Sequence, residues 1–206
     1  MAQITPTFFK TILQIEGGYQ NRTDDSGNYA CGQLIGTNMG ISAGALQTWW
    51  GRCPTVAEMK GLSQAQARDF YAWYFDRYNL YPIESQQLFE LLANNTMGSP
   101  SNAARVEQRT LTALGYPVAV DGVRGPATIA ALNRAWRDNP TRLYNAIRGA
   151  WVDYLTSLNK PQFLAGWLYR MDRFFPPISG GTVALGAGIL LGFAALWFFT
   201  QKKRAA

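Results

Sequence analysis

The sequence predicts a mainly α-helical protein with a small loop or hairpin region, followed by a single C-terminal transmembrane helix. Apolar residues recur at helical spacing over most of residues 1–175, and Ser, Thr, Asn or Pro marks the start of several of these segments. The 23 residues from Ile178 to Thr200 carry no charged side chain. Between Gly17 and Arg52 glycine and asparagine are dense and helical spacing is absent, which predicts a loop or a short hairpin.

The helices can be placed in order from their caps. Thr5 and Pro6 form a start signal for the first helix, and Gly17 ends it just after Glu16. The next helix begins at Ser63, which forms a capping-box pattern with Gln66. Further helices are expected over residues 86–97, 102–114, 126–137, 140–158 and 162–174.

The C-terminal stretch 178–200 is long enough to span a membrane, because a helix rises about 1.5 Å per residue and the hydrocarbon core is ~30 Å thick. A basic tail, residues 201–206, follows and favours a cytoplasmic or inner-face end. Small residues recur at every fourth position in this stretch and would permit close contact between helices in the membrane, either with a second copy or with other membrane proteins: Gly180, Ala184, Gly188 and Gly192.

Composition limits the chemistry. The chain has 206 residues and a formal net charge of +6, so its surface favours polyanions such as nucleic acid, an anionic membrane or an acidic wall polymer. It contains no histidine, which excludes Ser–His–Asp triads, Cys–His enzymes and His-ligated zinc hydrolases. Two cysteines, Cys31 and Cys53, cannot form a four-thiolate zinc site, and they are either free thiols or one disulfide. We therefore expect no metal, no cofactor and catalysis by carboxylates.

Three of the thirteen acidic residues stand out. Glu16 ends an apolar helix, where burial and the helix dipole would both raise its pKa, and we expect the fold to keep water and cations away from it. Asp24 and Asp25 lie in a polar, glycine-rich segment where a carboxylate stays ionised. One protonated and one ionised carboxyl is the arrangement that cleaves glycosidic bonds. The alternative is a surface charge at a helix end and a simple turn.

The other acidic residues are expected to have structural or solvent-exposed roles. Glu90 lies in an apolar helical segment and is assigned a structural role. Asp121 opens "DGVRGPAT", where the Asp-Gly pair is interpreted first as a turn. The remaining helical acids are interpreted as solvated surface charges: Asp69, Asp76, Glu107, Asp138 and Asp153.

Several segments together resemble glycoside hydrolase family 108, a lysozyme-like family of the phage endolysin type. "EGGYQNRTDDSGN" followed by "TNMGIS" resembles its N-terminal signature, with Asn28 at a position usually held by glycine, and "LFELLANNTMGS" is similar to its Phe-Asp-x-x-x-Asn-x-Gly helix. "VEQRTLTALGYPVAVDGVRGPATIAALNR" resembles the peptidoglycan-binding module of the family, and "FLAGWLYRMDRF" resembles its closing Gly-Trp-x-x-Arg helix.

The resemblance implies a lysozyme-like helical fold and cleavage of the β-1,4 bond of peptidoglycan, with Glu16 as the proton donor. By analogy with phage-type lysozymes, Asp25 would assist the attacking water and Thr37 would position it. Substrate contacts are expected from six residues: Tyr19, Asp24, Trp49, Trp50, Asn95 and Asp121. For the aromatic residues among them, packing in the core is an equal alternative to stacking on sugars.

The expected organisation is a catalytic region over residues 1–100, a peptidoglycan-binding-like helical module over 101–175, the membrane span 178–200 and the tail 201–206. The expected function is that of a muramidase anchored in a membrane, in a phage virion or alternatively in the bacterial inner membrane, with peptidoglycan and lipid as partners and no nucleic acid. Two alternatives remain: a wall-binding structural protein without catalysis, and a lytic transglycosylase.

Overall fold

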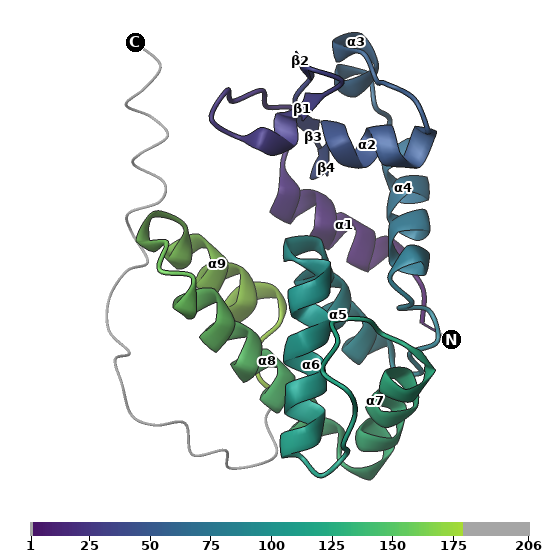
Figure 1. The fold of residues 1–206 in the computed structure, drawn as a ribbon, viewed down its shortest axis with the longest axis vertical. Coiled ribbons are helices and arrows are strands. Elements are labelled where there is room, and N and C mark those ends of the chain that lie inside the picture. Colours follow the sequence, from purple (N-terminus) through teal and green to yellow (C-terminus); the bar gives the residue numbers. More distant parts are fainter. Residues whose placement is uncertain (1, 179–206) are drawn as a thin grey trace.

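The computed structural model describes residues 2–178 and is mainly helical (Figure 1). Two short antiparallel hairpins lie between α1 and α2, and a 3₁₀ turn, η1 (Ser26–Asn28), precedes them. The helices are α1 (Pro6–Glu16), α2 (Ala43–Trp50), α3 (Val56–Lys60), α4 (Gln64–Arg77), α5 (Gln86–Gly98), α6 (Pro100–Ala113), α7 (Pro126–Asp138), α8 (Pro140–Ser157) and α9 (Pro161–Phe174). The mainly helical class and the predicted hairpin region are therefore confirmed.

Local capping explains where the predicted helices begin and end. Thr5 Oγ1 accepts a hydrogen bond from the Phe8 amide at the start of α1, and Gly17 ends this helix with a φ of 71°. At α4 the capping box between Ser63 and Gln66 is formed in both directions.

Helices α2 and α3 were not expected. Helix α2 starts at Ser42, whose side chain accepts from the Ala45 amide, and ends at the left-handed Gly51. Helix α3 has a capping box between Thr55 and Glu58. At 8 and 5 residues, both helices are too short for a repeating apolar pattern to reveal them.

The hairpins form a small layer at one end of the molecule, next to α2 and α3 (Figure 1). Strand β1 (Tyr29–Ala30) pairs with β2 (Gln33–Leu34), and β3 (Thr37–Asn38) pairs with β4 (Ile41–Ser42). The segment that leaves α1 joins this layer, because Gln20 and Thr37 exchange two backbone hydrogen bonds of 2.8 Å. The β3–β4 hairpin is thus fixed close to the end of α1.

One hydrophobic core runs through the described helices. Phe8 of α1, Phe75 of α4 and Phe89 of α5 pack ring against ring in its N-terminal part. Helices α5 and α6 follow one another directly, since Ser99 ends the first and starts the second. The boundary predicted near residue 100 falls at this junction.

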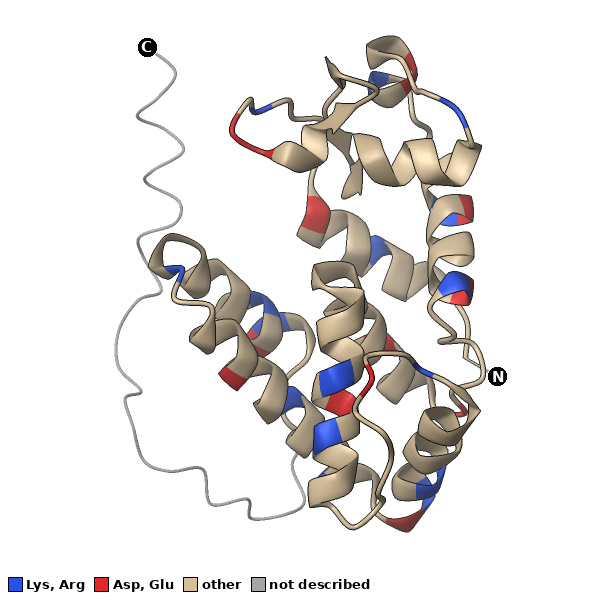
Figure 2. Ribbon diagram, viewed as in Figure 1, with Lys and Arg blue, Asp and Glu red and all other residues tan. Residues whose placement is uncertain are grey.

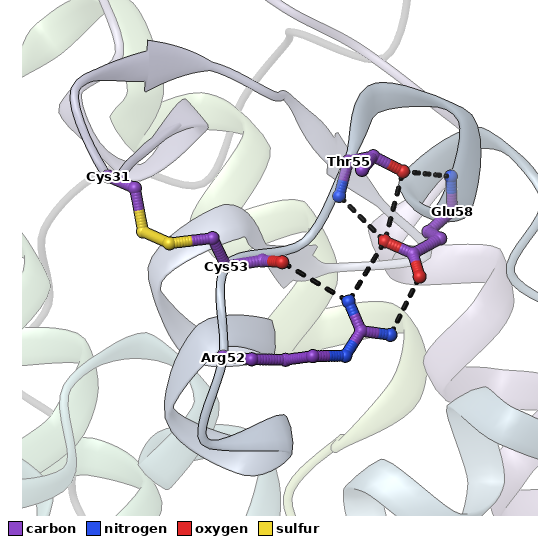
Figure 3. The surroundings of a disulfide bond; sticks show 5 residues. All are labelled: Cys31, Arg52, Cys53, Thr55 and Glu58. Atoms are coloured by element: carbon purple, nitrogen blue, oxygen red, sulfur yellow. Dashed lines mark hydrogen bonds and ion pairs between the residues drawn. A yellow bond between two sulfur atoms is a disulfide. The ribbon is translucent and has the colours of Figure 1, made fainter.

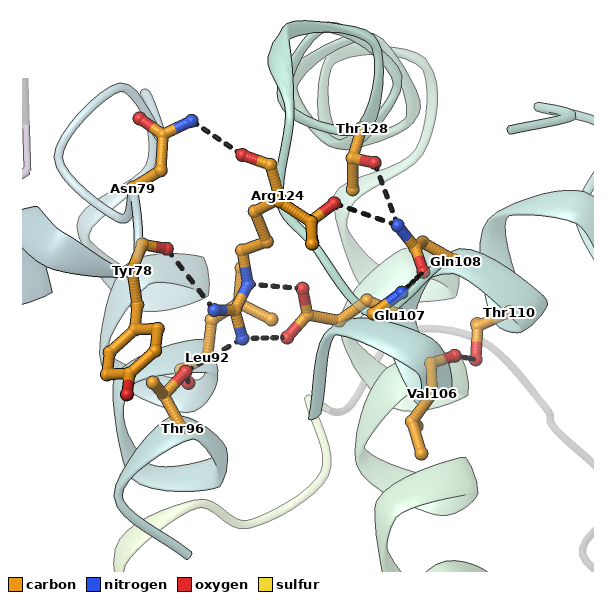
Figure 4. A network of polar contacts seen from close by, with 12 residues as sticks. Tyr78, Asn79, Leu92, Thr96, Val106, Glu107, Gln108, Thr110, Arg124 and Thr128 are labelled. Carbon is orange, nitrogen blue, oxygen red and sulfur yellow. Dashed lines mark hydrogen bonds and ion pairs between the residues drawn. The ribbon is translucent and has the colours of Figure 1, made fainter. Parts of the chain in front are cut away.

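A buried ion pair joins α6 to the loop before α7, and here the sequence prediction was wrong. Glu107, expected on a solvated surface, is fully buried, and both its oxygens accept from the Arg124 guanidinium at 2.6 Å. Figure 4 shows the same guanidinium reaching the Thr96 hydroxyl on α5 and the Tyr78 carbonyl after α4. Because a buried charge needs a partner, this network fixes α4, α5, α6 and the loop before α7 together.

The predicted transmembrane stretch 178–200 and the tail 201–206 lie outside the described residues, apart from Ile178. Among residues 2–178, none of the helices combines the length and the hydropathy that a membrane span requires.

Cys31 and Cys53 form a disulfide, which settles the open alternative (Figure 3). It joins the turn between β1 and β2 to the segment after α2, closing a loop across a sequence separation of 22. Beside it, Arg52 bonds both carboxylate oxygens of Glu58, and Glu58 also accepts from the Thr55 amide. These contacts lower the pKa of Glu58 to about 2, the Arg52 hydrogen bond contributing most.

Replacing both cysteines by serine is expected to lower the free energy of unfolding by about 3 kcal/mol, because the disulfide restricts the unfolded chain over a loop of this length. Denaturant unfolding of the double variant against the oxidised protein measures the loss. A reducing agent should reproduce it in the wild-type chain and change nothing in the variant; equal stability of the two proteins would contradict the prediction.

Candidate active site

Glu16 is the last residue of α1, and its side chain is held between elements from both ends of the chain. The carboxyl is only 21% exposed, and its Oε1 lies 3.4 Å from Nη1 of Arg170 on α9. The expectation that no cation lies near it was therefore wrong. An ion pair therefore joins α1 to α9.

The turn of the β3–β4 hairpin packs directly on Glu16. Gly40 has a φ of +76°, and a Cβ placed there would lie 2.6 Å from the Glu16 Cγ and 2.5 Å from the Tyr71 hydroxyl. Any larger residue would displace one of these side chains. Tyr71 is itself fixed, because its hydroxyl donates a 2.8 Å hydrogen bond to the Met39 carbonyl. The position of the Glu16 carboxyl is thus set by backbone and buried side chains.

Burial raises the pKa of the Glu16 carboxyl above its usual range, and the Arg170 charge opposes this rise without cancelling it. The same burial raises the pKa of Tyr71 well above its ordinary value, with the Glu16 charge as a smaller contribution. The surroundings of Glu16 therefore favour its protonated form, which is the form that a general acid needs.

The structure links Asp25 and Thr37 through two residues that the sequence analysis did not select. The Gln20 amide nitrogen lies 3.4 Å from Asp25 Oδ2 and donates a 3.0 Å bond to Asn28 Oδ1. The Thr37 hydroxyl donates to the same Asn28 oxygen at 2.7 Å. Asn28 is fully buried and donates in return to Gln20 Oε1, so it forms the centre of this hydrogen-bonded chain.

Asp24 and Asp25 differ in their surroundings although both are exposed. Asp24 forms a bidentate pair with Arg22, whose hydrogen bonds hold its pKa below the usual value. Asp25 caps η1, where its Oδ1 accepts from the Gly27 amide at 2.9 Å. The structure records no direct hydrogen bond or ion pair between Glu16 and either aspartate.

The predicted aromatic residues are half-buried and packed against protein. The Tyr19 hydroxyl donates to the Ile35 carbonyl, and Lys60 lies over its ring at 5.1 Å. Trp49 packs edge-on against Phe70, while the Trp50 ring carries the Arg52 guanidinium at 4.6 Å. Their contact with a substrate stays a prediction.

Asn95 lies near the end of α5, and Asp121 lies in the loop before α7. Asn95 is 1% exposed and accepts a hydrogen bond from the Asn94 amide. Asp121 accepts from the Val123 amide and from Gln108, contacts that lower its pKa and complete the turn predicted for it. The hydrogen bonds of Asn95 and Asp121 go to residues other than Glu16 and Asp25, and their substrate contacts also remain predictions.

Two residues beside Glu16 carried a signal that could have identified them. Arg170 is the arginine of the Gly-Trp-x-x-Arg pattern, whose tryptophan is Trp167. Gly40 lies in "TNMGIS" after Thr37. Both positions belong to segments that resemble the family, but only the fold shows that both residues lie against Glu16.

Arg170→Gln is expected to shift the alkaline limb of the pH profile of kcat/KM to higher pH. The Arg170 charge lowers the pKa of Glu16, so its removal raises this pKa further and the protonated acid persists to higher pH. Turbidity clearing of cell walls across the pH range measures the shift. Arg170→Lys should keep the limb in place, and so should Arg173→Gln, which removes a charge from the same helix; an unmoved limb in Arg170→Gln would refute the role.

Comparisons with known proteins match two regions of this chain. Residues 9–95 match the family described as Glycosyl hydrolase 108, and residues 102–172 match the one described as Predicted Peptidoglycan domain. The structure of Brucella abortus SagA is similar to this one, with a TM-score of 0.64 and 28% sequence identity. The alignment covers 84% of this chain and 97% of that chain.

A comparison with curated proteins finds no match. The two family matches include Glu16 in the first region and Arg170 in the second, so each region supplies one member of the ion pair. The chain is a lysozyme-like glycoside hydrolase acting on peptidoglycan, in which one region matches glycosyl hydrolase 108 and the next matches the predicted peptidoglycan domain.

Proposed function

We propose that the protein is a muramidase, which cleaves the β-1,4 bond between the sugars of peptidoglycan by carboxylate catalysis with Glu16 as the general acid. The observation that carries the proposal is the largely buried Glu16 carboxyl, whose pKa is raised although Arg170 lies 3.4 Å away. A raised pKa favours the protonated carboxyl, which is the form that can protonate the oxygen of a leaving sugar.

Arg170 would also stabilise the charge that appears on Glu16 after proton transfer. When Glu16 gives its proton to the glycosidic oxygen, the bond to the anomeric carbon breaks and a carboxylate remains at position 16. The adjacent guanidinium stabilises this new charge. Water then attacks the oxocarbenium-like carbon and loses a proton, which restores the acid at Glu16 or goes to a second base.

Asp25 and Thr37 are the proposed partners for the water. Asp25 is held by the Gly27 amide and remains open to solvent on its outer side. The Thr37 hydroxyl hydrogen is used by Asn28, so its oxygen is left to accept a hydrogen bond from water. The Gln20–Asn28 pair would keep both groups in a fixed relation.

The products distinguish muramidase activity from the alternatives. Purified peptidoglycan digested by the full-length chain should yield fragments with reducing muramic acid ends when analysed by mass spectrometry. Fragments with 1,6-anhydro ends would instead identify a lytic transglycosylase. Sedimentation of the chain with walls, without any release of fragments, would identify the wall-binding protein.

Residues 101–175 are proposed to hold the wall, and the match to the predicted peptidoglycan domain supports this. The net charge of +6 favours contact with an anionic wall. Figure 2 shows Lys and Arg spread over many elements of the ribbon, which supports a diffuse attraction to an anionic wall.

We also propose that residues 178–200 anchor the enzyme in a membrane, in a phage virion or alternatively in the bacterial inner membrane. The uncharged length of this stretch and the basic tail after it support the proposal. The full-length chain should float with lipid vesicles and a chain ending at Pro177 should not. Detection of the protein in purified phage particles would favour the virion over the bacterial inner membrane. Cross-linking of the chain in lipid vesicles tests whether it associates with itself.

A further inference from the structure

The turn of the β3–β4 hairpin, formed by Met39 and Gly40, has an unusual backbone. Both residues lie in the left-handed region, with φ values of 48° and 76°. A hairpin turn with two left-handed residues favours Asn, Asp or Gly at its first position, because a larger side chain crowds the backbone there. Met39 adopts this conformation at a cost, and such a conformation persists only where its surroundings hold it.

Two buried side chains hold the Met39–Gly40 turn from two helices. The hydroxyl of Tyr71 on α4 donates a 2.8 Å hydrogen bond to the Met39 carbonyl. Asn38, the residue before the turn, donates from Nδ2 to the Met59 carbonyl on α3, also at 2.8 Å. Tyr71 is 2% exposed and Asn38 is 7% exposed, so bulk water does not compete for either bond. The turn is therefore fixed to α3 and α4 together.

The turn presses on Glu16 without leaving space. A Cβ added to Gly40 would lie 2.6 Å from Cγ and 2.8 Å from Cβ of Glu16, and 2.5 Å from the Tyr71 hydroxyl. The Gly40 backbone therefore covers one side of the Glu16 side chain, where water would otherwise contact it. Burial is the main cause of the raised pKa of Glu16, and this turn supplies part of that burial.

Only one charged side chain faces Glu16 among the groups that affect its titration. Arg170 of α9 lowers the pKa of Glu16, and α4 places two phenols nearby, Tyr71 and Tyr74. Burial raises the pKa of both phenols, so they stay neutral over the range in which Glu16 titrates. Tyr71 is therefore a constant hydrogen-bond donor to the turn, and the turn itself carries no titratable side chain.

We propose that Tyr71 and Asn38 are positioning residues for the reaction: they hold the Met39–Gly40 turn against Glu16, and the turn directs the carboxyl and keeps water from it. The inference deepens the proposed function and rests on it, because it matters only if Glu16 is the acid. Both residues act through the turn. A loosened turn would misdirect the carboxyl and also let water reach it.

Tyr71→Phe tests the proposal, because it removes the bond to Met39 and keeps the ring. With soluble glycan strands as substrate, kcat should fall roughly 10- to 100-fold, since a small misplacement of a reacting group is costly. KM should change little, because the substrate contacts remain. The alkaline limb of the kcat/KM profile should move to lower pH, since water beside Glu16 lowers its pKa. Arg170→Gln moves the same limb the opposite way.

Two further variants show whether the effect passes through the turn. Asn38→Ala removes the second anchor and should give the same fall in kcat and the same shift of the limb. Tyr144→Phe is the matched control, because it removes the hydroxyl of a tyrosine on α8 that is 3% exposed, and it should change neither quantity. Circular dichroism confirms that each variant is folded. If Asn38→Ala unfolds, Tyr71→Phe still decides.

Two results for Tyr71→Phe would overturn the proposal. One is a wild-type kcat with an unmoved limb. The other is a loss of activity in which KM rises and the limb stays in place, because that result indicates a general structural role.

Failure of this inference and failure of the proposed function give different results. If Glu16→Gln keeps full activity, the assignment of the acid fails, whatever Tyr71→Phe does. If Glu16→Gln is inactive while Tyr71→Phe behaves as the wild type, only the role of the turn is refuted.

Discussion

Glu16→Gln is expected to lower the rate of wall hydrolysis at neutral pH by about 10²–10⁴-fold, the range that a positioned general acid contributes. Glutamine has nearly the same shape, so the packing against Gly40 and Tyr71 is retained while the transferable proton is lost. The release of reducing ends from purified peptidoglycan measures the effect. Glu90→Gln is the matched control, because Glu90 lies on α5 and bonds Gln86 instead of Arg170. Full activity in Glu16→Gln would refute the assignment of the acid.

The same variant should be more stable than the wild type at neutral pH. Burial raises the pKa of Glu16 in the folded state above the value of 4.5 for the exposed group. Below 4.5 the group is protonated in both states and contributes nothing. As the pH rises from there through the folded-state pKa, the unfolded state releases its proton first, so the wild type loses stability and the uncharged glutamine does not. Thermal unfolding at about pH 4 and about pH 7 should show a gain for the variant only at the higher pH.

Glu107→Ala is expected to cost about 3–5 kcal/mol of the free energy of unfolding, the range for breaking a buried ion pair. Arg124 is 4% exposed and would be left with a buried, uncompensated charge. It would also lose two short hydrogen bonds while keeping those to Thr96 and the Tyr78 carbonyl. Urea unfolding measures the loss.

A matched pair of controls separates burial from charge. Glu84→Ala breaks the ion pair between Arg137 and Glu84, whose side chains are 58% and 53% exposed. It should lower the free energy of unfolding by only a small fraction of the loss expected for Glu107→Ala. The double change Glu107→Leu with Arg124→Met removes both buried charges and should recover much of the lost stability. A Glu107→Ala protein as stable as Glu84→Ala would contradict the role of the network.

The helices were predictable from the sequence where the signals for their ends lie within one turn of those ends. Helices α5 to α9 begin and end within two residues of the expected positions, because capping side chains and prolines act over one turn. Helices α2 and α3 were missed although their caps are equally local, since they are too short to show a repeating apolar face. The segment from Gly17 to Arg52, which contains α2, was interpreted as a loop or short hairpin because glycine and asparagine are dense there.

The candidate site was predictable only in part, since its contacts are tertiary. Glu16 was selected from its place at a helix end together with the family resemblance, and its raised pKa agrees in direction with the burial argument, while its catalytic role stays a prediction. Its Arg170 partner is distant in sequence, and no spacing rule connects them. Glu107 was misassigned for the same reason: its partner Arg124 lies 17 residues away in a turn. Asn28, noted only as a departure from the family pattern, is the centre of the hydrogen-bonded chain between Asp25 and Thr37.

The ion pair between α1 and α9 limits how this enzyme can be rebuilt from interchangeable parts. One way to redirect a wall hydrolase is to join its N-terminal region to a new wall-binding region. Here the exchange would remove Arg170 together with residues 101–175, so a chimera joined at residue 100 would change the pKa of Glu16 as well as the wall that is bound. A useful chimera would have to carry α9 with the catalytic half.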